Sequence, residues 1–593
     1  MKLEDYMTAQ AIYRVLARLR VRIADKRHAD DLFWRVAKGA PNPAERHDGD
    51  VTTQFSESSV CKCLPSRRQW GRSTRTVRPT LQYGKMLEEG ILYAIRRQCK
   101  NGGLLACDWG RHLRALIDDI SAKLEDGHFL FQSPTLLTIP KSATESRCLA
   151  KFENLSDKLI LSQTARYIRD QFDDLLSPDS YAFRRSGEIS HVTAIRKLRD
   201  YRLRYIGKKL YVAECDIQKF FDVINHEEVL AAFDTFAQQL EIPIDPRARE
   251  VLIAFLKSYS SFRSVGEAFP DPEERKKISF LTSRELASQL KRFYGTTDFA
   301  SLPLGIPQGG ALSPILVNLV MDCADHAVTD GAPEDLFYAR FCDDMVIVHP
   351  DKKVCAAAFD RFVSKMEALR LPVHKVCKRF TYGTGFYGDK AVVIKDGYQP
   401  VPGKKLKSKG PYAWADVHVG GGTASPWVSF LGQQIRFDGA VRIRLSSIEK
   451  HKEKLRKEAS RLIRACGRKG QKLRDPNAVD DVYTAFRQRL MALGVGYSSD
   501  AERGSVEDRC WMSAFPGITR CPWTRQQMRE LDRERDAVLC KVRHGPLAHL
   551  DGTPAKADVK FLGRPFSYIG YLEREDRPDQ WLLTDDVSVY NEW

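Results

Sequence analysis

FYARFCDDMVIVH, residues 337–349, consists of two apolar runs on either side of the group Cys-Asp-Asp. This pattern predicts a β-hairpin with Asp343 and Asp344 at its tip. YVAECDI, residues 211–217, is a second buried-type strand and carries an acid, Asp216, at its end. Buried carboxylates beside strands are costly unless a cation neutralises them. If the two strand ends converge, the three acids therefore form a site for a divalent metal ion.

Mg²⁺ suits such a site because it prefers one or two carboxylates together with substrate phosphates. Two such ions can activate a primer 3′-hydroxyl and stabilise the departing pyrophosphate in an in-line displacement. The alternative is that Asp343 and Asp344 simply occupy a hairpin turn, where Asp is common. The dipeptide alone favours this simpler interpretation, so the wider sequence has to decide.

Six motifs stand in a fixed order between about residues 133 and 437: LLTIPKSATESRCLA, SYAFRRSGEIS, CDIQKFFDVINHEEVL, GIPQGGALSPILVNLVMD, RFCDD and SFLGQQI. Together they resemble the blocks of reverse transcriptases related to group II intron proteins. QGGALSP and FCDD, at the right spacing from DIQKFFD, are the most specific part of the resemblance, which covers roughly half the chain. It implies an α+β, right-hand polymerase fold with fingers, palm and thumb, and with helical N-terminal and C-terminal extensions.

This resemblance and the helical periodicity suggest a division of the chain. We expect a helical N-terminal extension with a basic linker at 1–125, fingers at 126–210, a palm at 211–440, and a helical thumb and C-terminal region at 441–593. The palm contains an insertion at about 226–304, whose role stays open between RNA contact, subunit contact and surface elaboration.

The resemblance also assigns roles at the acidic site. Asp216, Asp343 and Asp344 are expected to be catalytic and to bind metal, with the carbonyl of Ile217 as a further ligand. The expected cofactor is a pair of Mg²⁺ ions, for which Mn²⁺ is a substitute. The lysine that acts as general acid for pyrophosphate stays open between Lys375 and Lys378.

Further residues are expected to bind the incoming nucleotide. Lys141 and Arg147 match fingers residues that hold the triphosphate, although an ordinary surface pair is the alternative. Gln308 and Gly309 resemble the block along the nucleotide and template. Phe221 falls where the family places its steric gate against a 2′-hydroxyl.

A core role is the alternative for Phe221 and its neighbour Phe220. Strand alternation would place them on opposite faces, so that at most one is the gate. Phe341 stands where the family usually has Tyr, which is expected to alter primer contact or fidelity without abolishing metal binding.

The charge predicts a polyanionic partner. The net charge is +17, and residues 401–474 hold eighteen Lys and Arg against five Asp and Glu. Clustering of this kind is typical of an electrostatic groove for phosphates. Phe430, Leu431 and Gly432 resemble a primer-grip turn. The residues expected to contact nucleic acid in the groove are Lys404, Lys405, Lys407, Lys454 and Arg461, each with a solvated helix face or loop as the alternative.

Other classes of protein are disfavoured. Fourteen scattered cysteines show no recurrent zinc-finger spacing, and no apolar run approaches the length of a membrane span. The N-terminal residues lack the apolar segment of a signal peptide, so a cytoplasmic location is expected.

The expected activity is RNA-directed DNA polymerisation from dNTPs, with an RNA template or structured noncoding RNA as partner and DNA as product. By elimination the chain resembles the "unknown group"/abortive-infection reverse transcriptases, which implies antiphage defence and homo-oligomeric assembly. Two alternatives stay open: a group II intron-derived enzyme in retromobility or splicing, and an RNA-binding scaffold with a vestigial polymerase site. A protein primer at Tyr590 is a further hypothesis, with a docked tail aromatic as its alternative.

Overall fold

The structure is a computed structural model that describes residues 2–36, 59–70, 83–140, 145–377, 407–416, 424–467, 472, 479–495, 510–515, 517–547 and 567–573. The described residues fall into two compact units. The first unit contains residues 2–8 and 119–440, and the second contains residues within 9–118 and within 441–573.

The first unit carries both strands and helices. Its strands are β1 (Thr135–Pro140), β2 (Ser146–Lys151), β3 (Leu210–Asp216), β4 (Phe337–Phe341), β5 (Asp344–His349), β6 (Val376–Cys377), β7 (Ser408–Trp414), β8 (Trp427–Phe430) and β9 (Gln433–Arg436). Its helices are α1 (Leu3–Tyr6), α6 (Leu155–Phe172), α7 (His191–Arg204), α8 (Phe220–Val223), α9 (His226–Gln238), α10 (Pro246–Lys257), α11 (Ser261–Ala268), α12 (Pro272–Lys276), α13 (Ser279–Thr282), α14 (Arg284–Tyr294), α15 (Ser313–Thr329) and α16 (Lys352–Ala368).

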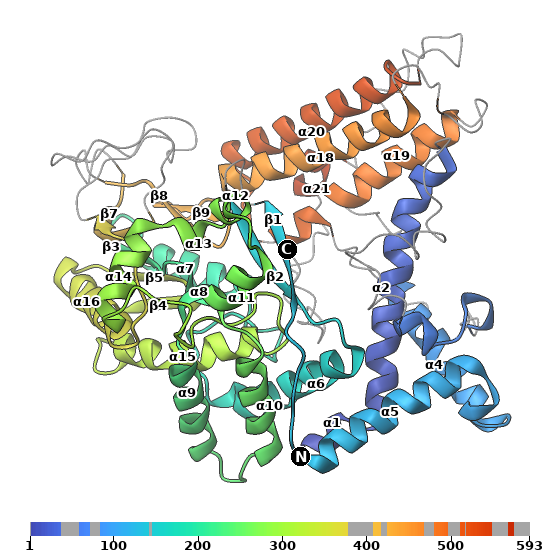
Figure 1. Cartoon of the computed structure of the whole chain (residues 1–593). Coiled ribbons are helices and arrows are strands. Elements are labelled where there is room, and N and C mark those ends of the chain that lie inside the picture. The colour runs from blue at the N-terminus through green and yellow to red at the C-terminus, as the bar shows by residue number, and fades with distance from the viewer. Residues whose placement is uncertain are drawn as a thin grey trace. The chain divides into compact units, whose positions relative to one another are not determined.

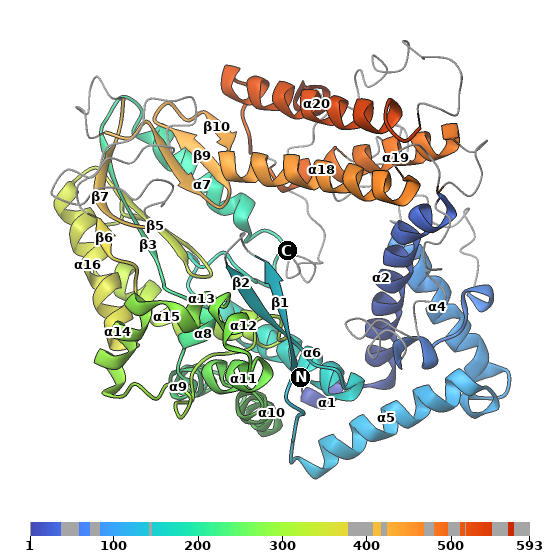
Figure 2. The ribbon, with the colours of Figure 1, turned by 45° about the horizontal axis from the view of Figure 1, so that its top comes forward.

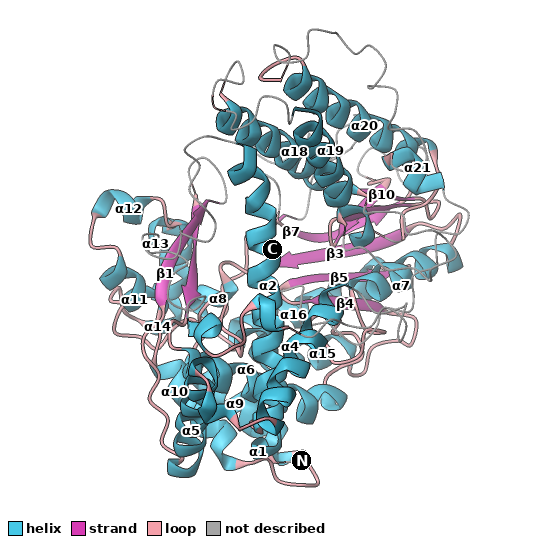
Figure 3. Cartoon of the chain, turned by 90° about the vertical axis from the view of Figure 1, so that its right-hand side faces the viewer, coloured by secondary structure: helices cyan, strands magenta, loops and turns pink. Residues whose placement is uncertain are grey.

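A five-stranded sheet of order β4-β5-β3-β7-β6 forms the centre of this unit (Figures 1 and 3). The continuous apolar run Met345–Val348 of β5 is buried, as expected for a strand covered on both faces. Helix α16 packs against β3, β5 and β7, while α15 packs against α16 and β4. Pro314 stands in the first turn of α15, where its missing N–H costs little. The packing of these helices on the sheet therefore fixes the positions of the residues at the ends of its strands.

A separate antiparallel hairpin, β1–β2, lies apart from this sheet (Figure 2). It is attached to the loop before α15, because the backbone N–H of Ala150 donates to the carbonyl of Gln308 at 2.7 Å. Gly309 follows with φ +94°, and a Cβ there would lie 3.0 Å from the Ala150 carbonyl. A glycine is therefore required for this close approach.

The second unit is mainly helical. Its elements are α2 (Ala9–Val36), α4 (Tyr83–Lys100), α5 (Asp108–Asp126, whose end belongs to the first unit), β10 (Val441–Ile443), α18 (Leu445–Cys466), α19 (Val479–Gly494), α20 (Pro522–Arg543) and α21 (Tyr568–Glu573). Helices α18, α19 and α20 share a core that includes Leu455, Leu462, Phe486, Leu490 and Val542 (Figure 1). Within the described residues, no helix has the length and apolar character needed to cross a bilayer.

The elements expected from periodicity are confirmed where they are described. The strand expected at 211–217 is β3, and the hairpin expected at 337–349 is β4–β5. Residues 226–304, predicted as an insertion in the palm, contain helices α9 to α14. The boundaries of fingers, palm and thumb stay predictions.

Candidate active site

The three predicted acids come together at one end of the central sheet. Asp216 is the last residue of β3 and lies directly opposite Asp344, the first residue of β5. Residues paired across neighbouring strands have Cβ atoms about 5 Å apart and point to the same face. Asp343 precedes Asp344 in the two-residue connection from β4 to β5. Two chain segments over a hundred residues apart thus bring their acids to one edge.

The acids influence one another electrostatically. Burial raises the pKa of Asp343, and the negative charge of Asp216 raises it further, whereas Arg147 and Lys407 lower it. A carboxyl group with a raised pKa beside a second carboxylate is stabilised in its charged form by any added cation. The edge is therefore electrostatically suited to a divalent ion.

Three residues lie around Asp216: Lys407, just before β7, Ser408, the first residue of β7, and His374 from a loop. The ammonium of Lys407 lies 3.4 Å from Asp216 Oδ2 and 2.9 Å from Nε2 of His374. Burial, followed by the charge of Lys407, lowers the pKa of His374 to about 4, so its neutral ring accepts the hydrogen bond from Lys407. The backbone N–H of Asp216 donates to Ser408 Oγ at 3.0 Å. Lys407, predicted for the nucleic-acid groove, thus lies beside Asp216.

The residues present fit a Mg²⁺ site of modest protein coordination. Among the described side chains, no group of three or more His, Cys, Asp and Glu is placed to share one ion. Asp216 and Asp343 supply two carboxylates, which is the number Mg²⁺ commonly takes from protein when phosphates complete its shell. Asp344 is exposed, and Ile217 is buried and bridged to Val373, so its carbonyl belongs to the same strand end. The ammonium of Lys407 beside Asp216 shows that this position attracts a cation.

The residues expected to hold the nucleotide are partly brought to this edge. Arg147 is exposed on β2, and its charge acts on Asp343. Lys141 lies outside the described residues. Gln308 donates from Nε2 to Asp222 Oδ1 at 3.3 Å, and Asp222 is buried. The amide of Gln308 is therefore held against the segment that follows Asp216.

The strand alternation expected for Phe220 and Phe221 is wrong. Lys219 adopts a left-handed conformation with φ +53° and starts the one-turn helix α8, so both rings lie on a helix and not on a strand. Phe220 is buried, whereas Phe221 is half-buried and meets Phe220 edge-on at 5.7 Å. The carbonyl of Phe221 accepts from the N–H of Ile306 at 2.8 Å. Phe221 is thus the ring of the two that retains an open side.

The predicted primer-grip residues form a tight hairpin turn between β8 and β9. Phe430 is buried and pairs with Gln433. Leu431 and Gly432 have φ +47° and +79°, and two positive φ values are the signature of a type I′ turn. Leu431 is thus held in a conformation that a non-glycine residue seldom adopts.

Some basic residues of α18 form ion pairs with acids. Lys452 bonds Glu530 at 3.4 Å, and Arg456 bonds Glu534 at 2.7 Å, both on α20. Lys454 is half-buried, and burial lowers its pKa. Arg461 is also only half-exposed, while Lys404 and Lys405 lie outside the described residues.

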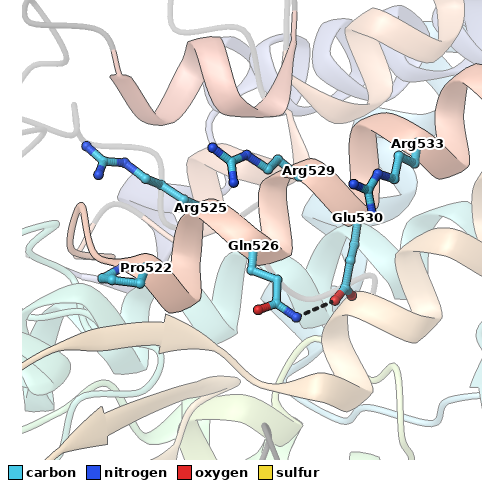
Figure 4. A pocket seen from close by; sticks show the side chains of 6 residues that line it. All are labelled: Pro522, Arg525, Gln526, Arg529, Glu530 and Arg533. Carbon is cyan, nitrogen blue, oxygen red and sulfur yellow. Dashed lines mark hydrogen bonds between the residues drawn. The ribbon is translucent and has the colours of Figure 1, made fainter.

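Helix α20 carries an exposed basic face, which we call the arginine ridge: Arg525, Arg529 and Arg533 (Figure 4). The three residues are four positions apart, so they follow one another on one helix face at a rise of about 6 Å per step. All three are exposed and line an open pocket of about 570 Å³. Arg525 approaches Glu573 only at 3.9 Å. The four-residue spacing of these arginines is visible in the sequence, but the denser positive charge at 401–474 favours α18 as the predicted nucleic-acid contact.

Comparison with known proteins identifies the family. The model for "Reverse transcriptase (RNA-dependent DNA polymerase)" matches residues 139–435, which is half of the chain. The chain belongs to this reverse transcriptase family. The predicted right-hand polymerase fold is confirmed by this membership together with the mixed helix and sheet architecture. In this reverse transcriptase, the acidic edge described above lies within the matched residues.

Among curated proteins, the putative COX1/OXI3 intron 1 protein of Saccharomyces cerevisiae is 28% identical over 260 residues, which cover 44% of this chain and 25% of the yeast protein. The chain thus spans about a quarter of this relative's length. Telomerase from Candida albicans, in complex with a fragment of telomeric RNA, has a TM-score of 0.33 at 10% identity and covers 82% of this chain and 76% of its own. Apo telomerase from Candida tropicalis gives 0.34 at 11%, with 72% and 63% covered. These TM-scores are too low to support an argument.

Proposed function

We propose that the chain is an RNA-directed DNA polymerase that adds dNTPs to a nucleic-acid 3′-end. The observation that carries this proposal is the direct pairing of Asp216 with Asp344 beside Asp343 at one sheet edge. Bound Mg²⁺ or Mn²⁺ would supply the Lewis acidity for two-metal phosphoryl transfer. Asp216, Asp343 and the carbonyl of Ile217 are the proposed ligands.

The cations at this edge are proposed to bind the nucleotide. Arg147 lies on the hairpin attached to the Gln308 loop and acts electrostatically on Asp343, so a triphosphate held by Arg147 lies close to the acids. A planar guanidinium suits phosphate oxygens. Lys141, which lies outside the described residues, is proposed to assist. Phe221 keeps an open side and is proposed to exclude a 2′-hydroxyl.

The nucleic acid is proposed to contact basic residues of the second unit. The arginine ridge presents three exposed guanidinium groups at a regular rise, which fits successive phosphates without reading bases. Lys454 and Arg461, both half-exposed, are proposed as further contacts of this unit, and Lys404, Lys405 and Lys407 are proposed contacts of the first unit. The proposed partners are an RNA template or structured noncoding RNA and the DNA product.

The test uses the purified full chain with its co-purifying RNA, Mg²⁺ and labelled dNTPs. Wild type is expected to yield labelled DNA that resists ribonuclease, and Asp343→Asn is expected to reduce the product to background. Asp360→Asn, an exposed acid on α16, is the matched control and should leave the yield unchanged. Equal yields from Asp343→Asn and wild type would refute the proposal.

We propose antiphage defence as the biological role. Residues 1–138 and 436–593 lie outside the matched polymerase core, and such additions suit a system with its own RNA partner and homo-oligomeric assembly. Phage plating on cells that carry the chain tests this role, with the double change Asp343→Ala and Asp344→Ala as the inactive partner. Protection that survives the double change would instead support an RNA-binding scaffold.

A second candidate is a group II intron-derived enzyme. The match to a yeast intron 1 protein favours it, at 28% identity over 260 residues. This candidate predicts an intron RNA encoded around the gene and specific binding of that RNA by the purified chain. Flanking DNA without an intron RNA excludes it.

A further inference from the structure

Arg340 lies on β4, two positions before the first residue of the catalytic turn, and its side chain is fully buried. The guanidinium makes a two-point ion pair with Asp325 of α15, with Nε and Nη2 each 2.6 Å from a carboxylate oxygen. Its Nη1 donates to the carbonyl of Cys342 at 3.0 Å. One buried group thus joins helix α15 directly to the turn that carries Asp343.

The guanidinium is held in place on every side. Nη2 also donates to Ser180 Oγ at 2.9 Å, and Nη1 approaches Asn318 Oδ1 at 3.3 Å. Asp325 is itself fully buried and accepts a hydrogen bond from the hydroxyl of Tyr338 at 2.7 Å. A network in which each polar group has a partner is rigid and fixes one geometry.

The backbone of Arg340 is fixed as well. Its N–H donates to the carbonyl of Asp179 at 2.9 Å, and its carbonyl accepts from Tyr181 at 2.9 Å. The end of β4 therefore cannot shift without breaking bonds on both its outer edge and its buried side.

Stability alone does not explain this network. Replacing a buried ion pair by apolar residues of similar volume is often neutral or stabilising by about 1–4 kcal/mol, because two charges no longer lose their hydration. The pair contacts the turn at a residue with unusual backbone geometry: Cys342 has φ +61°, a left-handed conformation that non-glycine residues seldom adopt. A conformation of this kind persists where its surroundings hold it, and the hydrogen bond from Arg340 does so.

We propose that Arg340, locked by Asp325, is a positioning residue for the catalytic turn. It fixes the Cys342 carbonyl and so sets the direction in which the next residue, Asp343, presents its carboxylate toward Asp216. This inference rests on the proposed function, because it gives the pair a purpose at the same acidic edge. The alternative is that the pair only stabilises the fold, so that the geometry of the turn does not change when the pair is removed.

The test separates these two roles by removing both charges together. The double variant Arg340→Met/Asp325→Asn leaves no unpaired buried charge, so its unfolding temperature is expected to equal or exceed that of wild type. Its Mn²⁺ affinity without nucleotide, measured by electron paramagnetic resonance titration of the full chain, is expected to fall about 10–100-fold, as for other residues that orient metal ligands. kcat is expected to fall while KM for dNTP stays constant.

A second variant and a matched control complete the test. Arg340→Lys keeps a charge beside Asp325 but loses the planar fork, so it is expected to fold and to show the same loss of Mn²⁺ affinity. The control pair Arg184→Met/Asp173→Asn removes another buried pair of the same unit, 3.1 Å apart, for which the described residues show no hydrogen bond to residues 342–343. The control is expected to bind Mn²⁺ as wild type does.

The outcomes are distinct. A folded double variant, or a folded Arg340→Lys variant, with wild-type Mn²⁺ affinity and wild-type kcat overturns the positioning role while the polymerase proposal stands. Equal loss of Mn²⁺ affinity in the control pair also overturns it. A wild-type chain that neither binds Mn²⁺ nor makes DNA overturns both proposals.

Discussion

Replacement of Lys407 by Met is expected to tighten metal binding at the acidic edge. Lys407 places its ammonium 3.4 Å from Asp216 Oδ2, where it competes with any other cation for the same carboxylate. Met keeps a similar length and removes the charge. The metal ion then no longer has to displace an ammonium before it binds.

The expected size follows from the distance and the exposure. Two unit charges 3.4 Å apart interact by about 1 kcal/mol in water and by about 5 kcal/mol at an effective dielectric constant of 20. The two side chains are 44% and 25% exposed, so the aqueous value is the better guide. Exposed pairs contribute at most about 1 kcal/mol, which corresponds to a roughly fivefold lower Kd for the metal ion.

The assay is a Mn²⁺ titration of the full chain without nucleotide, at low ionic strength so that salt does not screen the pair. Lys353→Met, an exposed lysine at the start of α16, controls for the loss of one positive charge. Equal or weaker Mn²⁺ binding by Lys407→Met, with an unchanged control, would refute the competition between Lys407 and metal.

Three other changes test the remaining proposals. Phe221→Val is expected to lower the preference for dNTP over rNTP about tenfold in kcat/KM, since space opens for a 2′-hydroxyl; an unchanged ratio argues against the gate. Arg529→Glu with Arg533→Glu is expected to weaken nucleic-acid binding and to reduce the slope of log K against log salt by about two, and an unaltered slope removes the ridge from the interface. His451 is buried against Trp511 and Tyr568. Burial, followed by the charge of Lys454, lowers the pKa of His451 to about 3. Because its folded pKa lies below the unfolded value, the free energy of unfolding falls as the pH drops from about 6.5 toward 3, by up to about 1.4 kcal/mol per pH unit. Urea unfolding of His451→Gln between pH 4 and 7 should show a smaller slope of this free energy against pH. A slope identical to that of wild type contradicts the assignment.

The sequence predicted the elements of the site because their signals are local. An apolar strand that ends at an acid spans residues 211–217, and two apolar runs around Cys-Asp-Asp span residues 337–349. The pairing that brings Asp216 opposite Asp344 follows once both strands belong to one sheet. Only the family resemblance, and not the pattern itself, indicated that they do.

The residues around Asp216 escaped prediction because strand pairing between distant segments places them. Lys407 and Ser408 follow Asp216 by about 190 residues and reach it through the antiparallel pairing of β7 with β3. Their spacing carries no signal of this contact, so the sequence predicts a role for Lys407 in the nucleic-acid groove together with Lys404 and Lys405. His374 lies in a loop. In this segment Lys375 and Lys378 are the candidates for the general acid, and no feature of the sequence indicates His374.

The error at Phe220 and Phe221 has a different cause. Extension of the strand beyond Asp216 assumed that the apolar pattern continues, but Lys219 takes a left-handed conformation and turns the chain into α8. The position of Lys219 in αL has no strong sequence signal, since glycine or asparagine usually marks such turns. Backbone geometry, and not side-chain pattern, therefore decided which face each ring occupies.

At the acidic edge, the negative charges of the carboxylates are only partly balanced by nearby positive side chains. Asp343 is disfavoured as a carboxylate by burial and by Asp216, and among the described residues the charges of Arg147 and Lys407 counter this effect. Lys407 has one ammonium, which it shares between Asp216 and His374, so it neutralises the acids incompletely. Arg147 is exposed on a hairpin and remains available for phosphate. The edge therefore suits divalent cations, and the guanidinium that moderates its charge is also the group proposed to bind the nucleotide.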